Sequence, residues 1–250
     1  MPHPTYRGIP VKSHLQNHDK VAQVLGDLIG SGAVLDLPAG PGAMSRRLAD
    51  AGYTVQAADI APGDFIPSDI PCVRADLNST LPFDDGAFDA AVCVEGLEHL
   101  ENVHHAVREL YRVLKPGGWL VVSTPNVTSA SSRLRFLLTG FFSVAERPVN
   151  EVHPSPGEGH IAVLTYPLLR FALRQAGFEV RWVTGSVRRN GGAWFYALWP
   201  WARMMTAKAL FTEEPDPRQR EINRRIAREI LSADLLLSRI LIVAARKPDN

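Results

Sequence analysis

Cysteine is scarce in this chain. Cys72 and Cys93 are the two cysteines among 250 residues, and both lie within short apolar runs that predict strands. A scaffold built on disulfides needs more cysteines in a shorter chain. The sequence therefore predicts buried, reduced thiols, which are typical of a cytoplasmic protein.

A surplus of one charge is also missing. The formal net charge is +1 at pH 7, from 27 basic and 26 acidic residues. A surface that coats nucleic acid carries a strong basic excess. We therefore expect no nucleic-acid partner.

Long hydrophobic runs are absent as well. Met1–Lys20 has no apolar core of signal-peptide length. The most apolar late stretch, residues 193–205, is interrupted by Pro200 and Arg203, whereas a bilayer span needs about 20 apolar residues. Hydrophobic residues make up 46% of the chain and charged residues 21%, which is ordinary for a globular protein. We expect one domain over residues 1–250.

What the chain does have is an alternation of strand-like apolar runs and helical patterns. The predicted strands are Val34–Leu37, Thr54–Ala58, Cys72–Ala75, Phe88–Val94, Trp119–Ser123, Gly177–Val183 and Arg239–Ala245. The predicted helices are one capped by Asn17 or Asp19 and running to Ile29, then Ala43–Ala51, Val103–Leu114, Thr128–Thr139 and Pro167–Ala176. This alternation predicts an α/β fold with a doubly wound, parallel sheet.

A long insertion, Gly185–Ser238, precedes the last predicted strand. Its first half is aromatic, with Trp194, Phe195, Tyr196, Trp199 and Trp201. In its second half Ile222, Ile226 and Ile230 are spaced by four residues, which predicts an amphipathic helix with a solvated arginine face.

The aromatic half of this insertion has more than one interpretation. It can be a lid over a flat or lipid-like substrate, or it can be core and dimer interface. Because Arg203 and Lys208 follow the aromatic residues, a peripheral membrane contact through residues 193–205 is a further interpretation.

The stretch Val34–Gly42 carries the strongest functional signal. An apolar run ends in Asp36, and a turn of small residues with Gly40 and Gly42 leads into a helical pattern. Glycines in such a turn let a ligand approach the backbone. Asp59 ends the next apolar run, and a carboxylate there suits the two hydroxyls of a ribose. The pattern predicts a cofactor that contains a nucleoside.

The spacing alone also suits an NAD-binding protein. In such proteins the carboxylate that binds the ribose follows the glycines by about 20 residues. Three features favour another cofactor. Asp36 would repel a pyrophosphate, and Ser45 stands where the dinucleotide pattern has its third glycine. Asp76 and Leu77 form a polar and apolar pair suited to an adenine. These features indicate an adenosine-like cofactor that lacks phosphate and carries positive charge.

Six motifs follow one another along the chain: Asp36–Gly42, Asp59, Arg74–Leu77, Leu81–Asp89, Glu95–Leu100 and Leu114–Gly118. In this order they resemble the signatures of class I S-adenosylmethionine-dependent methyltransferases, most closely the small-molecule enzymes similar to ubiquinone-biosynthesis O-methyltransferases. The resemblance covers residues 20–185 and resumes at Ser238–Lys247. It implies a Rossmann-like, mostly parallel seven-stranded sheet with an antiparallel last strand and a helical insertion before it.

The resemblance also implies roles for single residues. Those assigned to S-adenosylmethionine are Asp36, Pro38, Ala39, Gly40, Gly42, Asp59, Ile60, Asp76, Leu77 and Glu95. The turn would surround the methionine part, Asp59 would hold the ribose hydroxyls, and Asp76 would accept from the adenine amino group. Ile60 and Leu77 would pack on the adenine, and Glu95 would line the opposite side of the site.

Pro38 departs from the family, which usually has glycine at this position. Proline fixes φ and lacks an N–H, so the loop works only if that donor is not needed. The main prediction is O-methylation of a small molecule or of a glycan or lipid precursor. A catalytically silent S-adenosylmethionine-binding protein and an NAD-dependent oxidoreductase are the alternatives.

Methyl transfer from a sulfonium requires alignment of the acceptor and removal of its proton. His99 follows the fourth predicted strand, beside Glu98, and His160 lies in a segment that covers the substrate in relatives. We predict these two histidines as catalytic, with His153 as a further candidate base. The alternatives are that His99 caps or packs against the start of the helix beginning near Asn102, and that His160 is an exposed loop residue.

Glu95, Glu98 and His99 also resemble the metal ligands of small-RNA 2′-O-methyltransferases, in which a later histidine completes the set. Here that histidine is His153 or His160. Small-molecule relatives have similar residues without metal, and the chain lacks the basic excess that RNA binding requires. The sequence prediction is therefore that no metal is bound.

Overall fold

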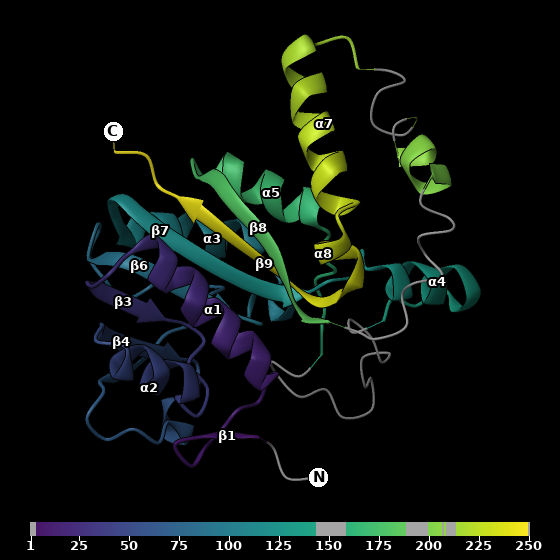
Figure 1. Cartoon of the computed structure of the whole chain (residues 1–250). Coiled ribbons are helices and arrows are strands. Elements are labelled where there is room, and N and C mark those ends of the chain that lie inside the picture. Colours follow the sequence, from purple (N-terminus) through teal and green to yellow (C-terminus); the bar gives the residue numbers. More distant parts are fainter. Residues whose placement is uncertain (1–3, 144–158, 189–199, 207, 209–213, 250) are drawn as a thin grey trace.

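The computed structural model describes residues 4–143, 159–188, 200–206, 208 and 214–249. A sheet in the order β5-β4-β3-β6-β7-β9-β8 runs through its centre (Figure 1). Its strands are β3 (Ala33–Asp36), β4 (Thr54–Asp59), β5 (Cys72–Arg74), β6 (Phe88–Val94), β7 (Leu114–Pro125), β8 (Glu179–Arg188) and β9 (Ser238–Arg246). A separate two-stranded hairpin consists of β1 (Thr5–Tyr6) and β2 (Ile9–Pro10).

The five neighbouring strands β5, β4, β3, β6 and β7 pair in parallel. Strand β9 is antiparallel to both β7 and β8. The predicted α/β fold with seven strands and an antiparallel last strand is confirmed. The chain leaves β3 on one side towards β4 and returns on the other side as β6. Crossovers that diverge in this way open a crevice at the carboxyl ends of β3 and β6, which is where such folds bind ligands.

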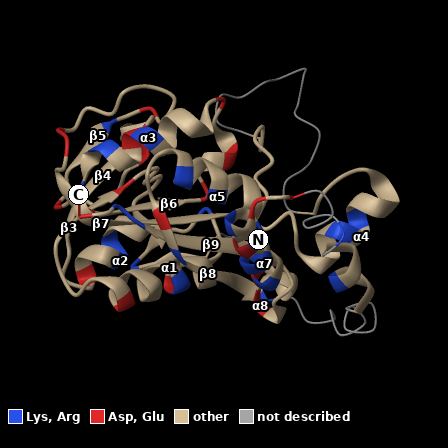
Figure 2. Ribbon diagram, turned by 90° about the horizontal axis from the view of Figure 1, so that it is seen from above, with Lys and Arg blue, Asp and Glu red and all other residues tan. Residues whose placement is uncertain are grey.

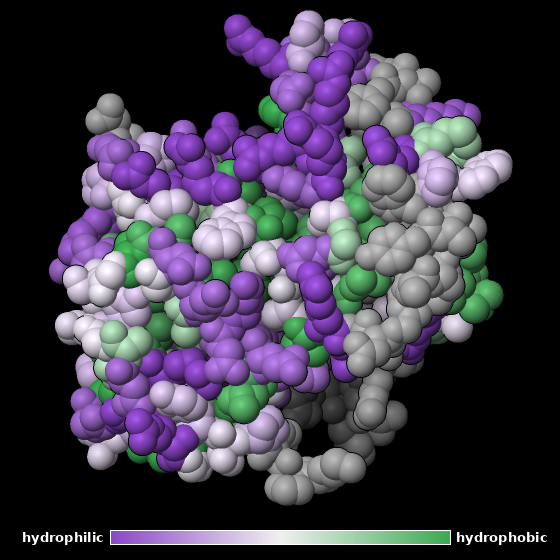
Figure 3. Space-filling model, viewed as in Figure 1, coloured by the Kyte–Doolittle hydropathy of each residue, from purple (hydrophilic) through white to green (hydrophobic). Residues whose placement is uncertain are grey.

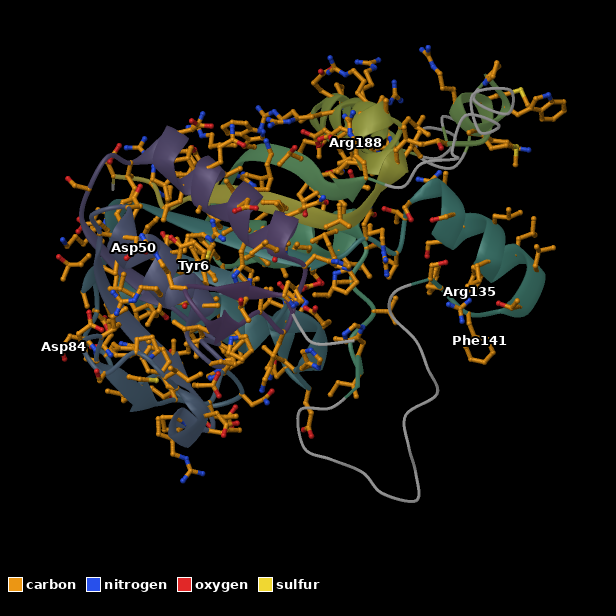
Figure 4. All side chains as sticks on the ribbon, turned by 60° about the horizontal axis from the view of Figure 1, so that its bottom comes forward. Tyr6, Asp50, Asp84, Arg135, Phe141 and Arg188 are labelled. Atoms are coloured by element: carbon orange, nitrogen blue, oxygen red, sulfur yellow. The ribbon has the colours of Figure 1, made fainter. Side chains whose placement is uncertain are left out.

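Helices cover both faces of the sheet (Figure 1). On one face lie α1 (Leu15–Leu28) and α2 (Ala43–Asp50), which bury Val24, Leu25 and Leu48 completely. On the other face lie α3 (Val103–Val113) and α5 (Tyr166–Gln175). The hairpin packs against α2, where the Tyr6 hydroxyl donates to Asp50 Oδ2 at 3.0 Å (Figure 4).

The start of α1 differs from the prediction. The helix begins at Leu15, so neither Asn17 nor Asp19 caps it. Asn17 is fully buried; its Nδ2 donates to Ser123 Oγ at 3.0 Å, and its Oδ1 accepts from Ser186 Oγ at 2.9 Å. The cap prediction was wrong because this asparagine satisfies strands β7 and β8 instead of its own helix end.

The Lys115–Gly118 segment ends α3 as predicted, since the helix stops at Val113. The structure extends β7 back to Leu114, five residues before the predicted start at Trp119. Pairing with β6 is irregular between Leu114 and Trp119. Gly117 there has φ +77° and would meet Asp249 Oδ1 at 2.6 Å if it carried a Cβ.

The insertion before β9 is helical, as predicted. It contains α7 (Pro217–Ile230) and α8 (Ala233–Leu237). Ile226 is buried and Ile222 is 40% exposed, and the outer face of α7 is hydrophilic (Figure 3). On that face Arg224 pairs with Glu221. Arg225 and Glu229 also pair, but on the side towards β8 and α5, where Arg225 donates to Val180 O and Glu229 accepts from the Tyr166 hydroxyl. Trp194, Phe195, Tyr196 and Trp199 lie outside the described residues, so the lid remains a prediction.

A further helix, α4 (Ala130–Thr139), follows β7 and stands away from the sheet (Figure 1). Ser129 caps it by accepting from Ser132 N. Short 3-10 turns follow β4 and β6, namely η1 (Pro62–Asp64) and η2 (Leu97–His99). Among the described residues, no helix is both long and apolar enough to cross a bilayer.

Candidate active site

The loop between β3 and α2 is anchored to the neighbouring strands by its own backbone. Leu37 N donates to Val92 O at 3.1 Å, and Ala39 N donates to Ala58 O at 2.9 Å. Gly42 then starts α2 with φ +93°, a conformation that glycine adopts without strain. Because the strands on both sides hold this loop, its position is fixed by the sheet.

The two glycines of the loop face different surroundings. A Cβ on Gly40 would meet nothing within 4 Å, whereas a Cβ on Gly42 would lie 2.6 Å from Pro67 Cδ and 2.7 Å from Phe65 Cε2. Gly40 is therefore the position where another molecule can approach the backbone. Gly42 is small because the chain's own segment after η1 packs against it.

Asp59 lies at the end of β4 and turns its carboxylate towards this loop. It is 8% exposed; Oδ2 accepts from Gly40 N at 2.7 Å, and Oδ1 accepts from Ala61 N at 2.9 Å. A carboxylate can accept about four hydrogen bonds, so both oxygens keep capacity for further donors such as a diol. Ile60 beside it is 55% exposed and offers an apolar surface.

Asp36 is enclosed at the end of β3. Its side chain is fully buried, and Oδ2 accepts from Ser45 Oγ at 2.5 Å. Burial raises the pKa of Asp36 to about 7, although the Ser45 hydrogen bond opposes the shift. Its Oδ1 has no hydrogen-bond partner among the described residues. Ser45, noted in the sequence as the missing third glycine, is thus the residue that ties Asp36 to α2.

The residues predicted for the adenine lie after β5. Asp76 is half-buried and its Oδ1 accepts from Asn78 N at 2.8 Å, which closes a turn. Leu77 is 5% exposed and belongs to the main hydrophobic cluster. The contact of Leu77 with an adenine ring stays a prediction.

Pro38 packs against the start of the segment that follows β6. A Cβ on Gly96 would lie 2.4 Å from Pro38 Cδ and 2.8 Å from its Cγ. The loop amides on either side of Pro38 make the bonds to β4 and β6, so the missing N–H removes none of those bonds. The sequence drew attention to Pro38 but not to Gly96, because this contact joins distant segments.

The segment after β6 carries two acidic side chains, Glu95 and Glu98, and the imidazole of His99. Glu95 has φ +48°, a left-handed conformation that is uncommon outside glycine, and burial raises its pKa. Glu98, in η2, is 2% exposed and its Oε2 accepts from Thr124 Oγ1 at 3.1 Å. Burial raises the pKa of Glu98 to about 8, and the nearby charge of Glu95 adds to the shift.

The structure brings the two predicted catalytic histidines together. The rings of His99 and His160 lie 4.9 Å apart between centroids, at 70° to each other. His99 Nδ1 lies 2.9 Å from Gly159 O. His99 does not cap α3, because Asn102 Oδ1 accepts from His105 N at that helix end. His153 lies outside the described residues.

Except for His160, these residues follow the carboxyl ends of β3, β4, β5 and β6, along one edge of the sheet. His160 reaches the same edge through the contacts of residues 159–162 with η2. A shallow hollow lined by Trp119, Arg181 and Arg246 opens elsewhere, at the opposite ends of β7, β8 and β9. We place the site at the edge with the loop and the histidines, because there polar groups with spare hydrogen-bonding capacity converge.

Comparison with known protein families gives a match of residues 35–122 to a methyltransferase domain. The demethylmenaquinone methyltransferase of Mycobacterium bovis is 33% identical over 172 residues, which are 64% of this chain and 73% of that protein. The ubiquinone biosynthesis O-methyltransferase of Chromobacterium violaceum is 35% identical over 105 residues, 37% of this chain and 44% of that protein. Several curated relatives match this chain over only 105 to 118 residues. The chain spans less than half the length of these relatives.

Among solved structures, a SAM-dependent methyltransferase from Archaeoglobus fulgidus superimposes with a TM-score of 0.59. The superposition covers 92% of both chains at 19% sequence identity. At this identity the likeness concerns the fold, which agrees with the sheet order and the helical layers described above.

Proposed function

Because the chain belongs to the family of S-adenosylmethionine-dependent methyltransferases, we propose that it transfers a methyl group from S-adenosylmethionine to a small, apolar acceptor. The observation that carries this proposal is the Asp59 carboxylate, held by Gly40 N and Ala61 N beside the open face of Gly40. A carboxylate with spare acceptor capacity next to an open backbone suits a ribose and the group attached to it.

The other residues of the loop also fit this cofactor. Gly40 has room for a ligand, Ile60 offers an exposed apolar face, and Asp36 keeps one buried oxygen without a partner in the described part of the chain. Where Asp36 is ionised, above its raised pKa of about 7, its negative charge would favour a cationic sulfonium nearby. These are the residues that we propose to hold S-adenosylmethionine, together with Asp76 and Leu77 on the adenine.

S-adenosylmethionine supplies a methyl group already activated by the positive sulfur. The protein must hold the acceptor in line with that group and accept the proton that the acceptor loses. If His99 donates its Nδ1 proton to Gly159 O, its Nε2 is left as an acceptor. We therefore propose that a hydroxyl of the acceptor gives up its proton to His99, or to His160 beside it.

A binding experiment tests the first part of this proposal. Calorimetry should detect S-adenosylmethionine and its demethylated product, S-adenosylhomocysteine, with no heat of binding for NAD. Binding of NAD alone would favour the oxidoreductase and overturn the proposal. Binding of both sulfur compounds without turnover on a broad panel of apolar hydroxyl compounds would favour a catalytically silent protein.

The apolar acceptor is proposed from the exposed surface of α4. Leu137 is 80% exposed and Leu138 is 74% exposed, and Phe141 and Arg135 project from the same end of the helix (Figure 4). Figures 2 and 3 show basic and hydrophobic residues over α4. No acidic residue occurs in the sequence from Asn126 to Ser143. Apolar side chains with basic neighbours are typical of a surface that binds anionic lipid, which would give access to a lipid-like acceptor.

Vesicles test the lipid surface. The chain should sediment with vesicles that contain anionic lipid and less with neutral ones, and Leu137→Ser with Leu138→Ser should reduce the bound fraction several-fold. Leu168→Ser, at a leucine of α5 that is 56% exposed, is the control and should have no effect. If the α4 variants instead separate a dimer into monomers in size-exclusion chromatography, the surface is an interface between two copies.

The cytoplasmic location also stays a prediction. Cys72 and Cys93 are both unpaired, and Cys93 is fully buried. Unpaired thiols are usual where the compartment is reducing.

A further inference from the structure

We propose that Arg239 binds an anionic oxygen group, a carboxylate or a phosphate, on the molecule that accepts the methyl group. This inference rests on the proposed methyl transfer, and it narrows the acceptor to an apolar molecule with one acidic end. Two observations carry it. Arg239 lies at the same edge of the sheet as the candidate active site, and its guanidinium has no ion-pair partner among the described residues.

The sheet fixes the place of Arg239, which is the second residue of β9. Asn126 N donates to Arg239 O at 2.8 Å. Because β9 is antiparallel to β7, the start of β9 lies beside the carboxyl end of β7. The start of α1 reaches the same edge, since Asn17 Nδ2 donates to Ser123 Oγ at 3.0 Å. Arg239 is therefore at the carboxyl edge of the parallel strands, where folds of this kind bind ligands.

The side chain of Arg239 is half-buried, and it takes part in none of the ion pairs found between described residues. Its Nε is buried and has no hydrogen-bond partner in the described part of the chain. A guanidinium is always charged and has five donors, and a buried charge is costly unless it is paired.

Arg188 on the neighbouring strand β8 shows the usual arrangement. It lies opposite Ser238 in the sheet and pairs with Asp234 at 3.3 Å. An anion that belongs to a ligand would complete Arg239 in the same way.

Two titratable groups from other segments lie near Arg239. Burial raises the pKa of Glu95, and the Ser13 hydroxyl and the charge of Arg239 oppose that shift. Burial lowers the pKa of His14, the residue before α1, and the charge of Arg239 lowers it further. Burial thus disfavours both the carboxylate of Glu95 and the imidazolium of His14, so Arg239 supplies the permanent positive charge of this cluster.

The strand order separates Arg239 from the proposed cofactor. The sheet runs β3-β6-β7-β9 at this place, and neighbouring strands lie about 4.8 Å apart. Arg239 is thus about 14 Å across the sheet from the loop after β3, and about 10 Å from the end of β6, which leads to His99. An acceptor whose hydroxyl lies at His99 has its other end on the side of Arg239.

A matched pair of ring compounds tests the preference for an acid. The full chain, saturated with S-adenosylhomocysteine, is titrated by calorimetry with 6-hydroxy-2-naphthoate and with 2-naphthol. These compounds share the ring system and a hydroxyl, and they differ in the carboxylate. We expect the parent to bind the naphthoate at least about tenfold more tightly, because hydrogen bonds between charged groups are the strong ones. Equal affinity for the two compounds, or binding of neither, would overturn the inference.

Substitutions assign the preference to Arg239. Arg239→Gln keeps a polar side chain and removes the charge, so the affinity for 6-hydroxy-2-naphthoate should fall at least about tenfold, while that for 2-naphthol stays the same. Arg239→Lys keeps the charge without the fork of donors and should retain part of the preference. Arg188→Gln, which removes an exposed arginine nearby, should bind both compounds like the parent.

Circular dichroism reports whether each variant is folded, and Arg239→Lys carries the test if Arg239→Gln unfolds. An Arg239→Gln protein that still prefers the naphthoate would contradict the assignment. An Arg188→Gln protein that loses the preference would contradict it as well, since the effect would then belong to the general charge of this edge.

The cofactor also has a carboxylate, on its methionine part, and a separate titration tests that source. 5′-Methylthioadenosine keeps the adenosine and the sulfur but lacks the amino-acid end. If Arg239→Gln weakens S-adenosylhomocysteine and leaves 5′-methylthioadenosine unchanged, Arg239 binds the cofactor and the inference about the acceptor is wrong.

The two proposals fail in different ways. A parent that binds no S-adenosylhomocysteine but prefers the naphthoate through Arg239 would overturn the proposed function and leave an anion site in place. Binding of S-adenosylhomocysteine without any preference for the acid would overturn this inference alone.

Discussion

The proposed cofactor side of the site, from β3 to β4, is held mainly by backbone amides, whereas the proposed acceptor side, from η2 to residues 159–162, depends on side chains of distant segments. On the first side Gly40 N and Ala61 N fix the carboxylate of Asp59. On the second side Glu98, His99 and His160 meet across a gap of about sixty residues in sequence. Local backbone geometry follows from turn residues, and this explains why the first side could be predicted from spacing.

Asp36 is an exception on the side that backbone amides hold. Its carboxyl is buried and is held by the side chain of Ser45. Burial raises its pKa to about 7, so the folded chain keeps a proton there that the unfolded chain loses near pH 4. Stability therefore falls as pH rises from about 4 to about 7, by up to roughly 4 kcal/mol from the shift in pKa. Asp36→Asn should flatten that part of the profile in denaturant unfolding at a series of pH values.

Ser45→Ala provides the check on this prediction. The Ser45 hydroxyl lowers the pKa of Asp36, so its removal should move the loss of stability to higher pH. An Asp36→Asn protein with the same pH profile as the parent would show that Asp36 does not titrate in this range.

Asp59→Ala tests the backbone-held side directly. The substitution removes the acceptor for Gly40 N and Ala61 N and the proposed ribose contacts. Hydrogen bonds to charged groups contribute about 1.5–3 kcal/mol each, so S-adenosylhomocysteine should bind roughly 100-fold more weakly in calorimetry. Asp76→Ala, on the proposed adenine contact, should cost less, and equal losses in both variants would contradict the central place of Asp59.

The two glycines of the loop should respond differently to alanine. Gly42→Ala places a methyl group 2.6 Å from Pro67 Cδ in a left-handed conformation, so the free energy of unfolding should fall by about 2 kcal/mol or more. Gly40→Ala meets open space and should cost about 1 kcal/mol through backbone strain, while it weakens cofactor binding. Thermal unfolding and calorimetry together separate these two effects, and a reversed order would refute the assignment.

Pro38 and Gly96 join the two sides, and their contact can be measured by a double-mutant cycle. Gly96→Ala in the parent would place a Cβ 2.4 Å from Pro38 Cδ. In a Pro38→Gly background this clash is gone, and the nearest remaining atom is Cys93 Sγ at 3.2 Å. We expect a coupling of about 1 kcal/mol in the free energy of unfolding. Additive effects of the two substitutions would mean that the loop and η2 move independently.

Much of the fold could be predicted from the sequence because the apolar runs are short and bounded by turn residues. The seven strands of the sheet and the antiparallel β9 agree with the family resemblance. The cap of α1 was wrong because Asn17 serves β7 and β8, a tertiary role that a local pattern does not contain. The start of β7 was placed too late because the irregular pairing before Trp119 resembles a turn.

The candidate site divides in the same way. The positions of Asp36, Gly40, Asp59 and His99 followed from the ends of predicted strands. The contacts of Thr124 with Glu98 and of Gly96 with Pro38 did not, since each joins two segments that the sequence does not connect. The grouping of Glu98 and His99 with a later histidine came only from the family resemblance, which left His153 and His160 open; the structure brings His160 to them. Ser45 lies between these cases: the sequence singled it out as a missing glycine, and the structure adds its hydrogen bond to Asp36.

The place of β9 between β7 and β8 has a consequence for synthesis of the protein. Both neighbours precede β9 in the chain, so while the ribosome is still producing residues 189–237 each of them has an edge with nothing to pair with. Unpaired strand edges promote association with other chains. We expect the nascent chain to depend on chaperones over this interval, and a stop codon before Ser238 to yield an aggregating product instead of a shortened methyltransferase.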